Sequence, residues 1–275
     1  MSSITIKMKH NFLIVFVLIA FAGMGQSPYK VISVNGEILA KKANVKLQSG
    51  IEVKSNDQFA FLIPNSRAAL INPQLGRIIL TEENAANAFS KAAFAPAIST
   101  VKSRGSLTTF ITTKPQLIAL FSDSLLIIDQ IELKISPNLF PMNEHAHFFM
   151  RYTYKGEEIN KRLPFKSDTL IINRCELYTI DGKPIPNPDV PQTKIYYYEV
   201  LGDNTKVTFL SSFNLIFISS DKLKKEVNVI RDAMKNASTE KILSEVYDYI
   251  QSFYGIIDKQ YLEDWYCKAF EEQKK

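Results

Sequence analysis

Two histidines offer the most direct chemistry in this sequence. His145 and His147 are separated by one residue, and on a β-strand such positions point to the same face. Their imidazoles could bind one metal ion, with Glu144 or a more distant carboxylate completing the ligand set. His10 is the only other histidine, and it belongs to the N-terminal leader predicted below, which rules out a three-histidine zinc site. The alternative is a pair that faces water at the entrance of a strand, so no metal or cofactor is expected.

The same two histidines would have to serve in any serine hydrolase. The sequence contains no Gly-x-Ser-x-Gly elbow, the turn that presents the nucleophile in α/β-hydrolases. A Ser-His-Asp triad would need His145 or His147 as its base. Acidic pairs such as Glu157-Glu158 are adjacent in sequence, whereas glycoside hydrolysis needs two carboxylates that face each other across a cleft. These patterns predict no catalytic residue.

Three consecutive tyrosines form a second group. On a strand, Tyr196 and Tyr198 share one face while Tyr197 takes the other. Tyrosine brings a large contact area with few rotatable bonds, and it is common at the energetic centres of interfaces. We therefore predict Tyr196 and Tyr198 as binding residues. Ordinary packing against neighbouring strands is the alternative.

The two cysteines, Cys175 and Cys267, admit two interpretations. In an oxidising compartment they could form a disulfide between the middle of the chain and its last helix. Each could instead be a small apolar residue with no covalent partner. A disulfide requires specific distances between the two residues, so the sequence leaves both interpretations open.

The composition describes an ordinary folded protein with a small excess of basic residues. Of 275 residues, 46% are hydrophobic and 22% are charged, with 33 Lys and Arg against 28 Asp and Glu. These values are typical of globular proteins. No dense basic run is present, so nucleic acid is not an expected partner. With only 10 glycines, the sequence also lacks the glycine-rich loops that bind nucleotides.

The N-terminus has the pattern of a secretory signal peptide. Lys7 and Lys9 precede an apolar run over residues 12–22, and Gly23-Met24-Gly25 places small residues before the expected cleavage site. A membrane-spanning helix needs about 20 apolar residues, so a cleaved leader is favoured over an anchor. We predict a signal peptide over residues 1–25, starting at Met1 or Met8. The mature chain would be periplasmic or secreted, with no stable membrane span.

Residues 26–80 are predicted to form a small β module. Short β-rich runs alternate there with turn residues. Asn35-Gly36 is a typical two-residue hairpin turn because both residue types tolerate positive φ. Five or six short strands in about 50 residues predict a small barrel or sandwich.

The order of motifs over residues 29–80 resembles the small β domain of FecR-like periplasmic proteins. The motifs are Val34-Asn35-Gly36-Glu37-Ile38, Leu47-Gln48-Ser49-Gly50-Ile51, Asn56-Asp57 and Ala68-Ala69-Leu70-Ile71. The resemblance implies a β module without catalytic function. FecR-like signalling proteins usually have a cytoplasmic segment and a membrane span before this domain, and neither is visible here. The resemblance therefore does not imply a role in transport signalling.

The rest of the chain is predicted to contain a linker, a second β domain and C-terminal helices. In the linker, residues 81–114, Thr81 and the following acidic and alanine-rich residues predict a helix that ends before Pro96. Residues 115–220 contain β-rich runs separated by turns, which favours an antiparallel sandwich. Residues 221–275 carry apolar stripes typical of three amphipathic helices that must pack together or against the sandwich.

The expected fold class is mainly β with α, with a small N-terminal barrel or sandwich and a C-terminal helical cap. Together with the leader, this favours an exported, non-enzymatic binding or scaffold protein whose partner is another envelope protein. One alternative is an exported hydrolase with a cleft between the two β modules. Another is a carbohydrate-binding module that uses Tyr196, Tyr198 or Trp265 as a stacking platform. The ligand and the oligomeric state do not follow from the sequence.

Overall fold

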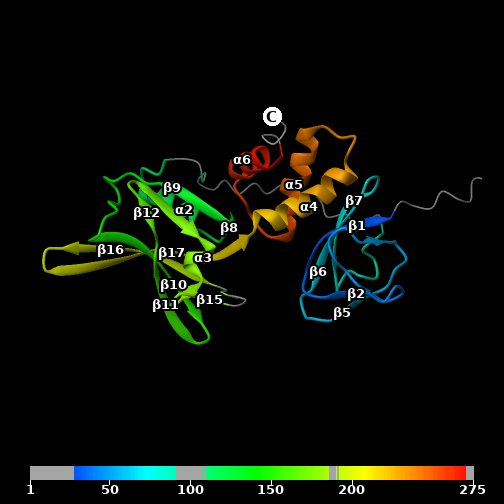
Figure 1. Cartoon of the computed structure of the whole chain (residues 1–275), viewed down its shortest axis with the longest axis horizontal. Helices are drawn as coiled ribbons and strands as arrows, with labels where there is room; N and C mark the ends of the chain where they lie inside the picture. Colours follow the sequence, from blue (N-terminus) through cyan, green and yellow to red (C-terminus); the bar gives the residue numbers. More distant parts are fainter. Residues whose placement is uncertain (1–27, 91–106, 108–109, 186–189, 191, 271–275) are drawn as a thin grey trace, which may run out of the picture.

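The structure, a computed structural model, describes residues 28–90, 107, 110–185, 190 and 192–270. They form two β modules with helices between them (Figure 1). The chain is mainly β, with several antiparallel sheets and a few helices, which confirms the predicted fold class. The predicted leader, residues 1–25, lies outside these ranges. Within them, no helix combines the length and the apolar character that a membrane span requires.

The first module consists of two small open sheets, so its form is a sandwich and not a closed barrel. The sheet orders are β4-β1-β6-β7 and β3-β2-β5. The strands are β1 (Tyr29–Asn35), β2 (Ile38–Ala40), β3 (Val45–Lys46), β4 (Glu52–Val53), β5 (Phe59–Phe61), β6 (Arg67–Asn72) and β7 (Gly76–Thr81). Between the sheets lies a core that includes Val31, Leu70 and Leu80.

The turn at Asn35-Gly36 does not close the predicted hairpin. The strands before and after it, β1 and β2, belong to different sheets, so the turn moves the chain from one layer to the other. Gly36 has a φ of +86°, and a Cβ atom there would lie 2.2 Å from the Ser66 Oγ. That hydroxyl accepts a hydrogen bond from the Glu37 N–H at 3.0 Å. Glycine is needed at this position for both its backbone conformation and its close approach to Ser66.

The linker begins with turns instead of the predicted helix. Residues 82–89 form consecutive turns. The Asn84 side chain accepts a hydrogen bond from the Thr81 N–H at 2.8 Å and donates one to the Ile79 carbonyl at 2.7 Å. Such side-chain bonds to nearby backbone compete with helix formation. The Phe89 ring packs against Tyr29 at 5.0 Å, which holds the turns on the first module. The rest of the predicted helix, from residue 91 onward, lies outside the described residues.

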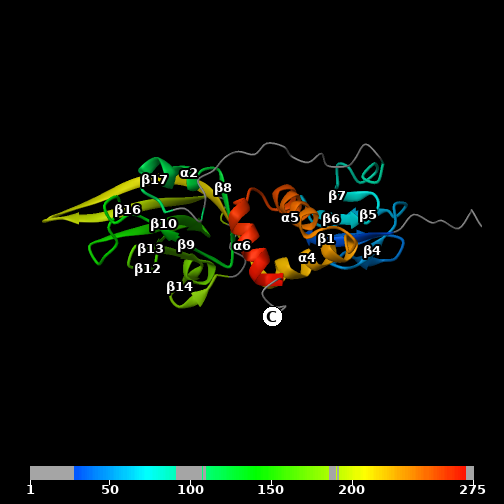
Figure 2. The same ribbon diagram turned by 90° about the horizontal axis from the view of Figure 1, so that it is seen from above.

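The second module is built on a five-stranded sheet and a three-stranded sheet. Their orders are β11-β10-β16-β17-β8 and β12-β13-β9. The strands are β8 (Ser124–Ile128), β9 (Gln130–Lys134), β10 (Ala146–Tyr154), β11 (Glu157–Arg162), β12 (Phe165–Lys166), β13 (Thr169–Asn173), β14 (Thr179–Ile180), β15 (Lys183–Pro184), β16 (Thr193–Leu201) and β17 (Asn204–Ile218). The short helices are α2 (Lys114–Leu120) and α3 (Arg174–Leu177). Pairing is antiparallel except between β17 and β8, which run parallel. The β16–β17 hairpin projects from the end of the module (Figures 1 and 2).

The C-terminal helices connect the two modules. They are α4 (Ser220–Ala233), α5 (Thr239–Phe253) and α6 (Lys259–Phe270), and they lie between the modules in both views (Figures 1 and 2). One apolar cluster joins Ile32 of the first module and Ile128 of the second to the inner faces of these helices. The helices that were expected to form a cap therefore connect the two modules, and they bury apolar side chains against both of them.

Candidate functional site

The outer face of the β10–β16–β17 sheet carries the two predicted binding tyrosines. Antiparallel register places Phe149 of β10 opposite Tyr196 of β16, and Tyr196 opposite Phe209 of β17. The next row consists of His147, Tyr198 and Val207. Residues directly opposite each other in a sheet share a face. We call this set the aromatic face; its members are His147, Phe149, Tyr196, Tyr198, Val207 and Phe209.

The three tyrosines point to alternate faces of the sheet, which confirms the prediction. Tyr197 is only 2% exposed and lies in the core, whereas Tyr196 and Tyr198 are half-buried on the opposite side of the sheet. The Tyr197 hydroxyl donates a hydrogen bond to the Pro141 carbonyl at 2.6 Å. Burial, with the nearby Glu199 charge, raises the pKa of Tyr197 to about 12. Its hydroxyl therefore keeps its proton and acts as a structural donor.

The rings of Phe149, Tyr196 and Phe209 contact one another in a continuous row across the aromatic face, and we call this row the aromatic ladder. The Phe149 and Tyr196 rings are stacked, with their centroids 5.0 Å apart and their planes 8° apart. Phe209 meets Tyr196 edge-on at 5.5 Å, and His147 lies 4.9 Å from Tyr198. Aromatic pairs of this kind each contribute about 0.5–1.5 kcal/mol beyond burial of area. These contacts restrict the positions of the rings that take part in them.

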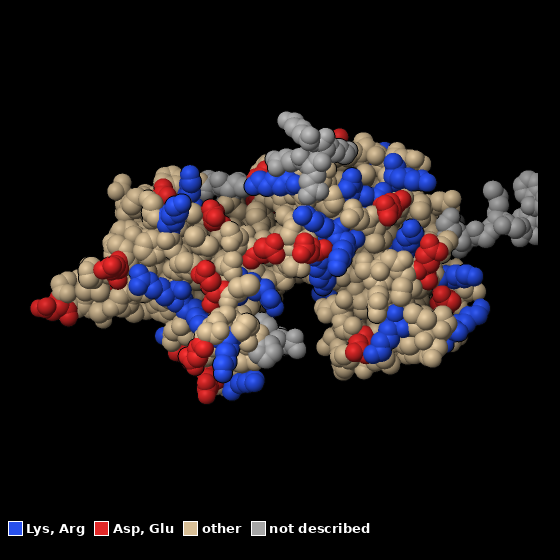
Figure 3. Space-filling model, in the orientation of Figure 1, with Lys and Arg blue, Asp and Glu red and all other residues tan. Residues whose placement is uncertain are grey.

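Two members of the aromatic face remain largely open to solvent. Phe209 and Val207 are each 53% exposed, and they lie on the projecting β17 strand. In the space-filling view, the projecting end of the second module is mostly uncharged, with acidic side chains at its tip (Figure 3). Contiguous exposed apolar side chains on a rigid element are typical of interaction surfaces.

An arginine stacks on the ladder from β10. The Arg151 guanidinium lies 4.9 Å from the centroid of the Tyr196 ring and 5.9 Å from that of Phe149. Its Nε donates to the Asn160 Oδ1 at 2.8 Å and lies 3.2 Å from the Glu158 Oε1. Cation–π contact and these two polar partners fix the guanidinium in one position. The stacked Phe149 ring also covers part of the Tyr196 ring.

The two histidines lie in different surroundings. His145 precedes β10 and is exposed, and its backbone N–H donates to the Asn143 Oδ1 at 2.8 Å. His147 is half-buried within the aromatic face, and burial, followed by the Arg162 charge, holds its pKa below the ordinary value. Among the described residues, no group of three or more His, Cys, Asp or Glu side chains is placed to hold a metal ion.

Three further sequence candidates lie away from the aromatic face. Cys175 in α3 and Cys267 in α6 are both exposed and are not joined by a disulfide. Trp265 belongs to α6, where its indole Nε1 donates to the Ser220 Oγ at 2.8 Å. Its ring meets Phe270 edge-on at 5.9 Å. Trp265 therefore takes part in helix packing and does not belong to the aromatic face.

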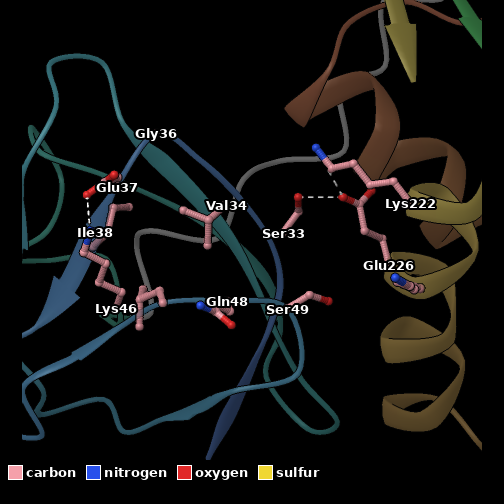
Figure 4. A pocket seen from close by; sticks show the side chains of 12 residues that line it. Ser33, Val34, Gly36, Glu37, Ile38, Lys46, Gln48, Ser49, Lys222 and Glu226 are labelled. Carbon is pink, nitrogen blue, oxygen red and sulfur yellow. Dashed lines mark hydrogen bonds and ion pairs between the residues drawn. The ribbon is translucent and has the colours of Figure 1, made fainter. Parts of the chain in front are cut away.

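A pocket of about 360 Å³ lies between the first module and α4. Its walls include the Gly36 turn, the Lys46–Ser49 segment and the α4 residues Lys222 and Glu226 (Figure 4). Neither His145 nor His147 lines it. The hydrolase alternative predicted a cleft between the two β modules, with one of these histidines as base, and this pocket has neither feature.

Glu226 is a buried carboxylate at the wall of this pocket, and it is only 2% exposed. Its Oε1 accepts hydrogen bonds from the Ser33 hydroxyl at 2.6 Å and the Tyr254 hydroxyl at 2.7 Å. Its Oε2 accepts one from the Tyr249 hydroxyl at 2.8 Å. Burial, followed by interactions that include the Glu226 charge, raises the pKa of both tyrosines, so they keep their protons and donate. The arrangement links β1 to α4 and α5.

Sequence reasoning missed the remaining residues of both sites. Phe209 could have been found from the period-two alternation of its strand, because the adjacent Leu210 is buried and Phe209 must then point to the other face of the sheet. Glu226 falls on the apolar stripe of its helix, beside Leu223 and Val227, where a charge is unexpected. Its three hydroxyl partners come from distant parts of the chain, so no local pattern indicates them.

No family model matches the chain, and no curated protein matches it. The resemblance of residues 29–80 to FecR-like domains therefore stays a prediction.

Proposed function

We propose that this chain is an exported, non-enzymatic binding or scaffold protein of the cell envelope, and that the aromatic face is its docking surface for another envelope protein. The proposal depends on the exposure of Phe209 and Val207 beside the stacked Phe149–Tyr196 pair. Aromatic residues and arginine are enriched among the residues that dominate binding energy at interfaces. A pre-formed ladder loses little conformational freedom when a partner binds. Export follows from the predicted leader.

Ring orientation favours a protein partner over a sugar. Carbohydrate stacking needs a flat ring face that is open to solvent. Tyr196 has one face stacked on Phe149, and the Arg151 guanidinium lies over its ring. Tyr198 is half-buried against His147. Apolar side chains from a protein can instead contact the exposed Phe209 and Val207.

Replacing Phe209 and Val207 by serine is expected to reduce partner capture at least about tenfold, because truncation of a residue that dominates the binding energy costs at least about 2 kcal/mol and each 1.4 kcal/mol corresponds to about tenfold in affinity. The double variant should fold normally, because both side chains are more than half exposed. The measurement is quantitative affinity capture from envelope extract with the mature chain. The control is Leu62→Ser in the first module, an exposed leucine outside the aromatic face. Equal recovery of the same stoichiometric partner by all three proteins would contradict the proposal.

A further inference from the structure

We infer that the aromatic face binds an acidic polypeptide segment that also carries a large apolar side chain. This inference rests on the proposed function and specifies the chemistry of the partner. It comes from the charges that surround the aromatic ladder.

Three cationic side chains border the aromatic ladder on the same face of the sheet. Arg162 of β11 lies directly opposite Phe149. Arg151 lies two residues beyond Phe149 on β10, and Lys194 of β16 lies directly opposite Arg151. Because side chains directly opposite one another, or two residues apart on one strand, share a face, all three cations lie on the face of the Phe149–Tyr196 pair and border it on two sides.

Acidic residues do not balance these cations. Across β11, β10, β16 and β17, all of which are described, the register places one acidic side chain on this face, Glu158 opposite Thr153. Glu158 is already paired with Arg151 at 3.2 Å. Glu199 lies on the other side of the sheet, where it pairs with Lys206 at 2.8 Å. The face therefore keeps an excess of positive charge.

Two of the cations have no carboxylate partner within the described part of the chain. Arg162 donates one hydrogen bond, from Nη2 to the Asn143 carbonyl at 3.1 Å, and a guanidinium has five N–H donors in all. The Lys194 side chain is exposed and makes no hydrogen bond or ion pair with any described residue. Both can therefore donate to carboxylates of a partner without breaking an existing ion pair.

Charge complementarity indicates which kind of partner binds the aromatic face. A second copy of this chain that docked through the same face would bring a second excess of positive charge to the interface, and like charges across an interface are unfavourable. The exposed Phe209 and Val207 need an apolar side chain as their partner, while Arg162 and Lys194, which both lie toward β10 and β11 from Phe209, need anions. An acidic peptide that also carries an aromatic or aliphatic residue supplies both.

The test uses a displayed library of random peptides, selected against the full mature chain. The wild-type chain should enrich peptides that contain Asp or Glu together with an aromatic or aliphatic residue. The double variant Arg162→Glu/Lys194→Glu should bind the best of these peptides at least about tenfold more weakly. The matched control is Lys166→Glu/Lys183→Glu, which changes the net charge equally at two exposed positions on other strands. It should leave binding unchanged.

The possible outcomes separate this inference from the proposed function. If the selected peptides depend on Phe209 but show no acidic preference, or bind the charge-reversed double variant equally well, the inference is wrong and the binding surface stands. If no selected peptide is affected by Phe209→Ser, both fail. If the chain associates with itself and Phe209→Ser abolishes this association, the partner of the aromatic face is a second copy of the chain and not an acidic peptide. Binding only to vesicles of anionic phospholipid would replace it by a membrane surface, and either result overturns the inference.

Discussion

Replacing Glu226 by alanine is expected to lower the free energy of unfolding by at least about 3 kcal/mol. The carboxylate accepts three hydrogen bonds from hydroxyl groups, and a bond to a charged group contributes about 1.5–3 kcal/mol. Its removal leaves the Tyr249 hydroxyl in a buried site without its acceptor, which adds a desolvation penalty. Urea unfolding followed by circular dichroism measures the difference.

Milder and neutral variants test the same network. Tyr249→Phe removes one donor and keeps the carboxylate, so it should lower the free energy of unfolding by about 1.5–3 kcal/mol, the contribution of one hydrogen bond to a charged group. Asp232→Ala, also on α4 but exposed, should change stability by less than about 0.5 kcal/mol. A Glu226→Ala protein as stable as the Asp232→Ala protein would show that the buried carboxylate does not hold the helices to the first module.

The Glu226 network is one of several polar links across this junction. The Arg77 Nε donates to the Glu245 Oε1 at 2.6 Å, and its Nη1 donates to the Ser252 hydroxyl at 2.6 Å. Arg67 donates from Nη2 to the Phe253 carbonyl at 2.7 Å. The helices are thus joined to the first module through directional bonds as well as apolar contact, which fixes the orientation of the bridge.

Replacing Tyr197 by alanine is expected to destabilise the second module by about 3–5 kcal/mol, the range for removing a large aromatic side chain from a core. The Tyr197 ring packs 4.7 Å from Phe140 and 5.1 Å from Phe148, and its hydroxyl bond to the Pro141 carbonyl would also be lost. Tyr198→Ala, the adjacent change on the outer face, should cost no more than about 1 kcal/mol. Thermal or urea unfolding of the two variants provides the comparison.

The pair of variants tests the register of the sheet. A shift of one residue would exchange the faces of every side chain on β16. If Tyr198→Ala destabilised the protein more than Tyr197→Ala, the aromatic face would be part of the core. The assignment of Tyr196 and Tyr198 as surface residues would then be wrong.

Local patterns predicted some features of the site, because alternation along a strand needs no knowledge of its neighbours. Tyr196 and Tyr198 were assigned to one face in this way. Their partners could not be assigned, because Phe149 and Phe209 become neighbours of Tyr196 only through strand pairing. A register shift between Ile195 and Tyr196 changes which β17 residues face them. Neither Ile195 nor Tyr196 is a glycine, the residue that often marks a bulge in a strand.

The incorrect predictions also have physical explanations. Thr81 and the acids after it resemble a helix start, but the Asn84 side chain bonds to nearby backbone and stabilises turns instead. Asn35-Gly36 has the composition of a hairpin turn, yet the flanking strands find their partners elsewhere in the module. In both places, tertiary contacts and side-chain bonds prevail over local propensity.

The most direct test of the account is site-specific photo-crosslinking in intact cells of the source organism. A benzophenone amino acid would replace either Phe209 on the aromatic face or Leu62 on the first module, both of which are at least half exposed. We predict that the reagent at position 209 yields one dominant crosslinked species, formed with an envelope protein, and that the reagent at position 62 does not. A dominant crosslink from position 62, with none from position 209, would contradict the central claim that this protein binds its partner through the aromatic face.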